Sequence, residues 1–238
     1  MAARRVTAVA HRGMPYRARE NTLPALRAAV AAGADAVEVD VRLTRDGAPV
    51  VLHDRTLERL WGVDVALAGV TAAELVTRTG GGVPSLPAAL AELRPVRTLI
   101  DLPDPAAVPA TVRTVRECAA ADRVYYCGGP AAMRLVRRAD PAAEIALTWH
   151  RAAPVRPSLL ADVRPRWLNL RFGLVRAELV ARCRADGLLV SAWTADTRRT
   201  MRRLLHAGVD AVTTNRLEVL TALRDGPEGA RPAAARLG

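Results

Sequence analysis

The sequence contains no lysine, so its positive charge comes from arginine, and the formal net charge is +11. A strongly basic chain can bind nucleic acid or an anionic membrane surface. Here the arginines are scattered along expected helices, as between residues 198 and 203, with little aromatic interleaving and no recognised nucleic-acid motif. Solvated helix faces explain this distribution better, and we expect no nucleic-acid partner.

Cysteines are few, and no apolar run is long enough to cross a bilayer. The three cysteines, Cys118, Cys127 and Cys183, are too few for a disulfide framework in a chain of 238 residues, and their spacing matches no zinc motif. The apolar run before His11 has only five residues, which is too short for a signal peptide. We therefore expect buried thiols, a cytoplasmic protein and no stable membrane insertion.

Half of the residues are hydrophobic, which is enough for a substantial core although only 3% are aromatic. Expected strands lie near residues 6–11, 36–41, 97–102, 123–127, 144–149, 167–171, 188–193 and 211–214. Expected helices lie near residues 21–32, 86–94, 106–121, 130–139, 157–163, 176–186, 197–207 and 216–224. This alternation predicts a parallel α/β fold. Eight repeats in one domain of this size favour a (β/α)8 TIM barrel, which typically has about 250 residues.

Capping residues and local composition indicate where the first helix and the barrel repeat begin and end. Asn21 is the predicted N-cap of the first helix, and Gly33 is its predicted stop. Residues 55–82 interrupt the repeat after the second strand and form a short insertion. Residues 226–238 are rich in glycine, proline and alanine, so we expect a disordered basic tail after a barrel of residues 1–225.

The strand expected at residues 36–41 carries two acidic side chains. Because successive side chains point to opposite faces of a strand, Glu38 and Asp40 share one face and the valines share the other. Two adjacent carboxylates repel each other unless a cation lies between them, and oxygen ligands suit Mg²⁺ or Ca²⁺. The alternative is a half-exposed strand with both carboxylates in solvent. A central parallel strand disfavours this alternative, since both of its faces are normally covered.

Two histidines follow short apolar strands in the same part of the chain. His11 ends the first strand, and His53 follows a short strand at residues 49–52. An Asp46-Gly47 hairpin turn precedes this short strand. One histidine at such a position would more often be a structural hydrogen-bonding residue. Two histidines that flank a carboxylate pair instead predict an acid and a base. The sequence does not say which histidine has which role.

The motifs that contain these residues resemble the glycerophosphodiester phosphodiesterase family. They are His-Arg-Gly at 11–13, Glu-Asn-Thr at 20–22, Glu-Val-Asp-Val at 38–41, Leu-Thr at 43–44, Asp-Gly at 46–47 and Val-Leu-His-Asp at 51–54. Thinner matches follow at 83–86, 192–194, 208–210 and 214–215, so the resemblance spans nearly the whole chain. It implies a TIM barrel and metal-dependent cleavage of a glycerol-based phosphodiester.

The resemblance also implies roles for individual residues. His11 and His53 would be the acid–base pair, and Arg12 would hold a phosphate oxygen. Trp193, on a late strand, would form an apolar wall against the glycerol or its substituent, although a place in the core is nearly as reasonable.

The implied metal ligands are Glu38 and Asp40, with Glu20 completing the polar shell. A further ligand is expected from the third barrel strand, where the family usually has a glutamate followed two residues later by a lysine. Here these positions are Asp101 and Pro103. Aspartate keeps the charge but is one methylene shorter, and proline carries no charge.

Because Pro103 replaces the family's lysine, the site lacks the positive charge that this lysine would carry. One hypothesis is that Arg171 supplies it from across the barrel mouth, because Arg171 and Asn169 share a face of their strand. The late Thr-Asp of the family is also changed, to Thr214-Asn215.

The function predicted from these observations is hydrolysis of a glycerophosphodiester or lysophospholipid to an alcohol and a glycerol phosphate. One alternative is a lyase-type phosphodiesterase that stops at a cyclic phosphate. Another is a catalytically weakened barrel that only binds phosphodiesters, which would fit the lost lysine. The sequence leaves the alcohol group, the preferred ion and the oligomeric state open.

Overall fold

The protein is a closed barrel of parallel strands in a computed structural model that describes residues 5–226. The barrel strands are β1 (Thr7–His11), β2 (Ala36–Leu43), β6 (Arg97–Asp101), β7 (Val124–Gly128), β8 (Ile145–Trp149), β9 (Trp167–Arg171), β10 (Leu189–Trp193) and β11 (Ala211–Thr214). Strand β1 pairs in parallel with both β11 and β2, which closes the sheet. The predicted TIM barrel is confirmed.

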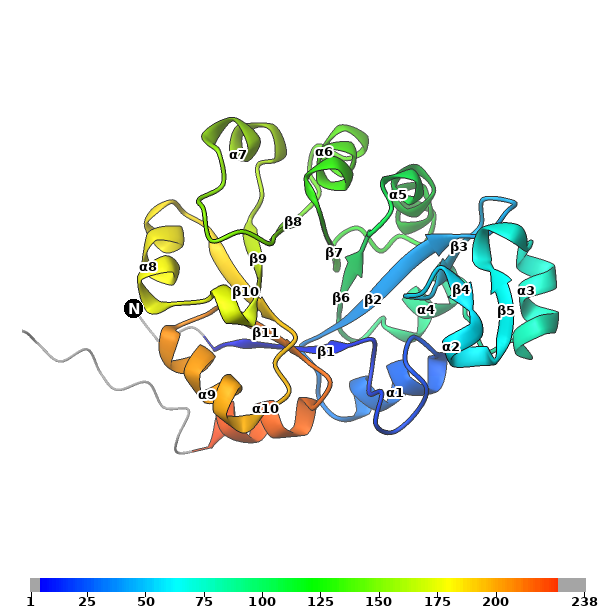
Figure 1. The fold of residues 1–238 in the computed structure, drawn as a ribbon, viewed down its shortest axis with the longest axis horizontal. Helices are drawn as coiled ribbons and strands as arrows, with labels where there is room; N and C mark the ends of the chain where they lie inside the picture. The colour runs from blue at the N-terminus through cyan, green and yellow to red at the C-terminus, as the bar shows by residue number, and fades with distance from the viewer. Residues whose placement is uncertain (1–4, 227–238) are drawn as a thin grey trace, which may run out of the picture.

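Helices cover the outside of the barrel (Figure 1). They are α1 (Leu23–Ala31), α4 (Leu86–Glu92), α5 (Val108–Glu117), α6 (Pro130–Ala139), α7 (Pro157–Val163), α8 (Ala177–Ala185), α9 (Arg198–Ala207) and α10 (Leu217–Asp225). Short 3₁₀ turns lie at Leu67–Gly69, Pro105–Ala107 and Phe172–Leu174. Each expected strand and helix is present. The largest difference in bounds is in α5, which ends at Glu117 because Ala119 takes a positive φ of 48° and turns the chain toward β7.

Successive side chains of a strand point alternately out of and into the barrel, so the apolar residues form two separate layers. Val37, Val39 and Val41 of β2 point outward and pack in the layer between the strands and the helices. The barrel interior holds a second cluster, in which the rings of Tyr125 and Trp167 lie 6.2 Å apart. Glu38 and Asp40 point into the barrel beyond this apolar cluster, where they line a cavity.

The insertion after the second strand is a small folded unit rather than a loop. Strand β3 (Pro49–Val51) pairs antiparallel with β2, as the expected hairpin requires. The chain continues through β4 (Thr56–Leu57), α2 (Glu58–Trp61), β5 (Val63–Ala66) and α3 (Ala72–Thr79). Leu57, Leu67 and Leu75 lie in the centre of its own hydrophobic cluster. This unit lies on one side of the barrel, next to β2 and β3 (Figure 1).

The prediction that Asn21 caps α1 is wrong. Thr22 is the N-cap, and Asn21 adopts a left-handed backbone with a φ of 57°. The Asn21 side chain is buried and donates from Nδ2 to Oδ2 of Asp40 at 2.8 Å, so it supports the site instead of the helix. Gly33 follows the end of α1 with a φ of 77°, as expected of a helix stop.

The two remaining predictions concern the tail and the membrane. The expected tail lies outside the described residues except for its first residue, Gly226. Within residues 5–226, no helix combines the length and the apolar character that a bilayer crossing requires.

Gly13 provides a test of how tightly the loop after β1 is held. Its φ is +83°, and a Cβ at this position would lie 2.6 Å from both the carbonyl carbon and the oxygen of Ala25. We expect Gly13→Ala to lower the free energy of unfolding by about 3 kcal/mol, because backbone strain and a clash with α1 add together.

Gly187→Ala is the matched control. Gly187 also has a positive φ, +75°, but nothing lies within 4 Å of its added Cβ. The control should lose only the strain, about 1 kcal/mol, in urea unfolding. Equal losses for the two variants would contradict the close packing of this loop.

Candidate functional site

Polar side chains from most barrel strands surround one cavity of about 420 Å³ at the carboxyl ends of the strands. Active sites of TIM barrels lie at this end, because the loops that follow the strands converge there. The lining side chains are His11, Arg12, Glu38, Asp40, His53, Leu99, Asp101, Pro103, Cys127, Thr148, His150, Asn169, Trp193 and Thr213, with Gly128 and Gly129. Most of the residues proposed from the sequence therefore meet in one place.

Three carboxylates form the acidic centre of the cavity. Glu38, Asp40 and Asp101 each offer an oxygen, and these oxygens lie within 4.8 Å of one another. The arrangement follows from strand register, because Asp40 of β2 lies directly opposite Asp101 of β6. The shorter side chain of Asp101 therefore still reaches the group. These three residues could hold a metal ion.

Electrostatics support this reading of the acidic centre. Burial, followed by the charges of Asp40 and Asp101, raises the pKa of Glu38 well above its ordinary range. Burial and the charge of Asp40 raise the pKa of Asp101 to about 6. Buried carboxylates with raised pKa values are short of positive charge. A hard divalent cation with oxygen ligands would supply that charge, so these residues fit the expected metal.

Cys127 is a neighbour of the acidic centre that the sequence did not mark. Its thiol lies 3.4 Å from Oδ1 of Asp101 and lines the cavity. Burial raises the pKa of this thiol, and the nearby carboxylates add to the effect, so the sulfur stays protonated and can donate to Asp101. Pro103, in the position of the missing lysine, also lines the cavity.

His11 is held by a neutral partner. Its Nδ1 lies 2.8 Å from Oδ1 of Asn215, and its Nε2 lies 3.9 Å from Oε2 of Glu38. Asp196 fixes Asn215 by accepting from its backbone N at 2.8 Å and from its Nδ2 at 2.7 Å. Because a carboxylate only accepts, the amide oxygen of Asn215 must face His11, whose Nδ1 is then the donor. Burial, and next the charge of Arg12, lower the pKa of His11.

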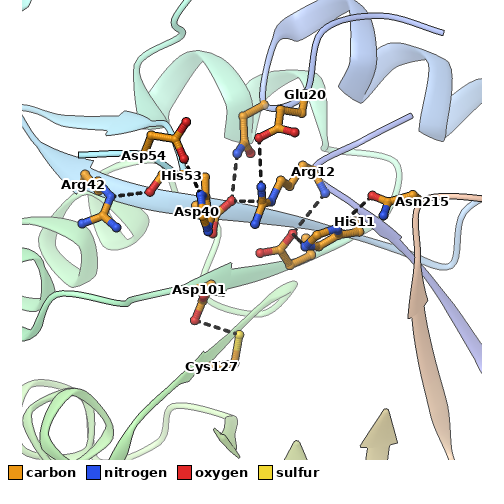
Figure 2. A network of polar contacts seen from close by, with 12 residues as sticks. His11, Arg12, Glu20, Asp40, Arg42, His53, Asp54, Asp101, Cys127 and Asn215 are labelled. Atoms are coloured by element: carbon orange, nitrogen blue, oxygen red, sulfur yellow. Dashed lines mark hydrogen bonds and ion pairs between the residues drawn. The ribbon is translucent and has the colours of Figure 1, made fainter. Parts of the chain in front are cut away.

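His53 is held by a charged partner on the other side of the site. Its Nδ1 lies 2.7 Å from Oδ1 of Asp54, and its backbone oxygen accepts from Nε of Arg42 at 2.6 Å. Figure 2 shows His11 with Asn215 at one end of the network and His53 with Asp54 at the other. Each histidine is thus anchored through Nδ1, which leaves its Nε2 for chemistry.

Arg12 lies between the acidic residues. Its Nε is 3.0 Å from Oδ2 of Asp40, and its Nη1 donates to Oε1 of Glu20 at 2.9 Å. Its backbone N donates to Oε2 of Glu38 at 3.0 Å, which helps to hold the left-handed φ of 57° at this residue. Local strain of this kind is typical of functional sites.

Glu20 is not brought into the group of three carboxylates. Its Oε1 accepts from Arg12 and also from Nη2 of Arg59 at 2.6 Å. Two arginines therefore occupy this carboxylate, and the structure places Glu20 as their common acceptor rather than beside Asp101.

Of the residues predicted on β9 and β10, some line the cavity and Arg171 does not. Trp193 lines the cavity, and its ring meets the ring of His150 edge-on at 5.7 Å between centroids. Asn169 lines the cavity too, but Arg171, two residues further along β9, is exposed and is not among the lining residues. The expectation that Arg171 supplies a cation at the cavity therefore has no support from the described lining.

Sequence reasoning missed the residues that position the histidines. Asn215 was marked only as a departure from the family pattern, and Asp196 was not marked at all. Asp196 lies three residues after Trp193, in a loop whose sequence gives no sign that it reaches Asn215.

Asp101 provides a test of the acidic centre in the absence of metal. Because its pKa is raised from the ordinary 3.8 to about 6, the ionised form costs stability, and this cost is largest above pH 6. We expect Asp101→Asn to raise the free energy of unfolding by about 2 kcal/mol at pH 8 in chelator, a gain that shrinks as the pH falls toward 4. The exposed Asp122→Asn is the control. Urea unfolding that shows a loss, or an equal gain at both pH values, would contradict the raised pKa.

Comparison with known proteins places this site in a family. The chain is 32% identical to a protein of Mycobacterium tuberculosis named probable glycerophosphodiester phosphodiesterase 2, over 90% of this chain and 88% of that protein. A crystal structure of glycerophosphodiester phosphodiesterase from Agrobacterium tumefaciens is 26% identical, with a TM-score of 0.80, over 93% of this chain and all of the other (100%).

A second similar structure, at 22% identity, shows likeness of fold alone. It is an Oleispira antarctica phosphodiesterase in complex with the product sn-glycerol-3-phosphate, with a TM-score of 0.85 over 93% of this chain and 98% of that one. The model of the glycerophosphoryl diester phosphodiesterase family matches residues 11–219, which include the two histidines and the acidic centre. The chain belongs to the glycerophosphoryl diester phosphodiesterase family and is a phosphoric diester hydrolase.

Proposed function

We propose that the protein hydrolyses glycerophosphodiesters to an alcohol and a glycerol phosphate with the help of Mg²⁺ or Ca²⁺. The observation that carries this proposal is the arrangement of two histidines, each fixed through Nδ1, around three clustered carboxylates in one cavity. The product named for the Oleispira antarctica structure supports a glycerol phosphate as one product here.

Glu38, Asp40 and Asp101 would hold the metal ion. When bound, the ion would act as a Lewis acid and offset the charge of the phosphate. Arg12 would hold a second phosphate oxygen, which suits its forked donors. The carboxylates of Asp40 and Glu20 fix the Arg12 guanidinium in place, so little of its side-chain freedom is lost when the substrate binds.

The different partners of the histidines suggest a division of roles. His11 faces the amide oxygen of Asn215, and burial lowers its pKa, so the ring is neutral and its Nε2 can accept a proton as the general base. His53 faces the carboxylate of Asp54 through Nδ1, and we assign the general acid to this second histidine. His11 would deprotonate the attacking hydroxyl, and His53 would protonate the leaving alcohol.

The attacking hydroxyl can be the substrate's own 2-hydroxyl, because its position next to the phosphate gives a large proximity advantage. This route forms a cyclic phosphate that water then opens. An enzyme that releases the cyclic phosphate would be the lyase alternative. We further propose a cytoplasmic site of action, since the three cysteines are free thiols.

A product assay tests the function. Purified protein should release choline and glycerol phosphate from glycerophosphocholine, and excess chelator should lower the rate more than a hundredfold until Mg²⁺ or Ca²⁺ is restored. Lysophosphatidylcholine and glycerophosphoethanolamine, assayed in parallel, would show the range of alcohol and acyl groups accepted. Phosphorus NMR showing only a cyclic phosphate would favour the lyase. Binding of glycerophosphocholine without turnover at saturating metal would favour the binding protein.

The leaving group tests the two histidine roles. An alkyl alcohol needs a proton as it leaves, whereas p-nitrophenolate leaves without one. We expect His53→Ala to lower kcat about a hundredfold or more on glycerophosphocholine but less than tenfold on the p-nitrophenyl diester of glycerol phosphate.

His11→Ala should lower kcat by about a hundredfold or more on both substrates, since both need the base. The reverse pattern, with His11→Ala selective for the alkyl substrate, would exchange the two roles. Steady-state kinetics with choline and p-nitrophenol detection separates the two outcomes.

A further inference from the structure

Arg59 of the insertion contacts both sides of the site although it does not line the cavity. Its Nε donates to Oδ2 of Asp54 at 2.6 Å, and its Nη2 donates to Oε1 of Glu20 at 2.6 Å. Asp54 is the partner of His53, and Glu20 is the partner of Arg12. The contacts form one continuous chain from Arg12 to His53.

The two oxygens of Asp54 are divided between two partners. Oδ1 contacts Nδ1 of His53, and Oδ2 contacts Arg59. A carboxylate held at only one oxygen can rotate away from its partner. With Arg59 on the second oxygen, the plane of the carboxylate is fixed, and so is the direction from which it meets the His53 ring.

Arg59 is itself fixed at both ends of its guanidinium. Burial raises the pKa values of Asp54 and Glu20, but the hydrogen bonds from Arg59 and their other cationic partners outweigh it, so both pKa values are lowered. Both carboxylates are therefore ionised, and a charged fork that donates to two of them has one preferred geometry.

Helix α2, which carries Arg59, is a firm support. The guanidinium of Arg19, in the loop after β1, lies 4.2 Å from the centre of the Trp61 ring. The Trp61 ring also lies so close to Gly82 that a Cβ there would be 2.0 Å from a ring carbon. The Leu57 side chain next to α2 is buried in the cluster of the insertion.

Stability alone does not account for these contacts. The Arg59 side chain is 50% exposed, and ion pairs with such exposure contribute little to the free energy of folding. The value of the contacts lies in the geometry that they impose on less exposed partners, Asp54 at 21% and Glu20 at 15%.

We propose that Arg59 is a positioning residue for the general acid: it holds Asp54 against His53, with Glu20 as its second anchor. The insertion would then set the orientation of a catalytic histidine. This inference rests on the proposed function, in which His53 protonates the leaving alcohol.

The test compares leaving groups, because a residue that acts through the acid affects only substrates that need it. We expect Arg59→Ala to lower kcat on glycerophosphocholine about tenfold or more, and to change kcat on the p-nitrophenyl diester of glycerol phosphate by less than about threefold. KM should change little for either substrate. Arg59→Lys should restore part of the loss, since an ammonium can still contact Asp54 but lacks the fork.

Arg78→Ala is the charge-matched control, because Arg78 is an exposed residue of the same insertion, on α3. It should leave both substrates unaffected. In a His53→Ala background, Arg59→Ala should have little additional effect on glycerophosphocholine, because the acid through which it acts is gone.

Three results would overturn the proposal: equal losses on both substrates, no loss on either, or full additivity with His53→Ala. If Arg59→Ala unfolds at the assay temperature, Arg59→Lys and its combination with His53→Ala give the same comparison. Failure of the proposed function looks different, since the unchanged protein would then release neither choline nor p-nitrophenol, or would accumulate a cyclic phosphate.

Discussion

The mutual repulsion of three clustered carboxylates, two buried and one half-buried, is the constraint around which the site is built. Parallel strands of a barrel end at one rim, so Asp40 and Asp101, opposite each other in β2 and β6, cannot move apart without breaking the sheet. Glu38 lies two residues before Asp40 on β2, so both side chains are on the same face of the strand. The raised pKa values of Glu38 and Asp101 show that the fold tolerates this crowding rather than being stabilised by it. Such a cost is typical of functional sites.

The histidines share one design principle but differ in charge environment. Both are anchored through Nδ1, which presents Nε2 to the cavity side. The anchor of His11 is an amide that Asp196 orients, so Nδ1 of His11 contacts a neutral group and not a carboxylate. The anchor of His53 is a carboxylate in direct contact, moderated by Arg59. A reaction that needs one base and one acid at the same pH benefits from this difference.

The sequence predicted the parts of the site that depend on strand ends and failed where loops meet. His11, Glu38 and Asp40 follow from strand ends and alternation, whereas Asp101 was expected only from the resemblance to the family, and the structure brings all four to one cavity. Asp196 and Arg59 act through contacts with residues far away in sequence or in other loops, and no local pattern encodes such contacts. Asn21 was expected to cap a helix because asparagine favours that role, but its side-chain amide instead donates a hydrogen bond to the Asp40 carboxylate.

The absence of lysine from this chain has its clearest consequence at the cavity. The resemblance to the family predicts a lysine where this chain has Pro103, and Arg171 does not line the cavity. Among the described residues that line the cavity, Arg12 is the single arginine, and Asp40 and Glu20 already pair with it. No further arginine among the described lining residues is left to balance both the acidic centre and an incoming phosphate. The three clustered carboxylates could hold a metal ion, and such an ion would supply the positive charge that the lining arginine alone does not.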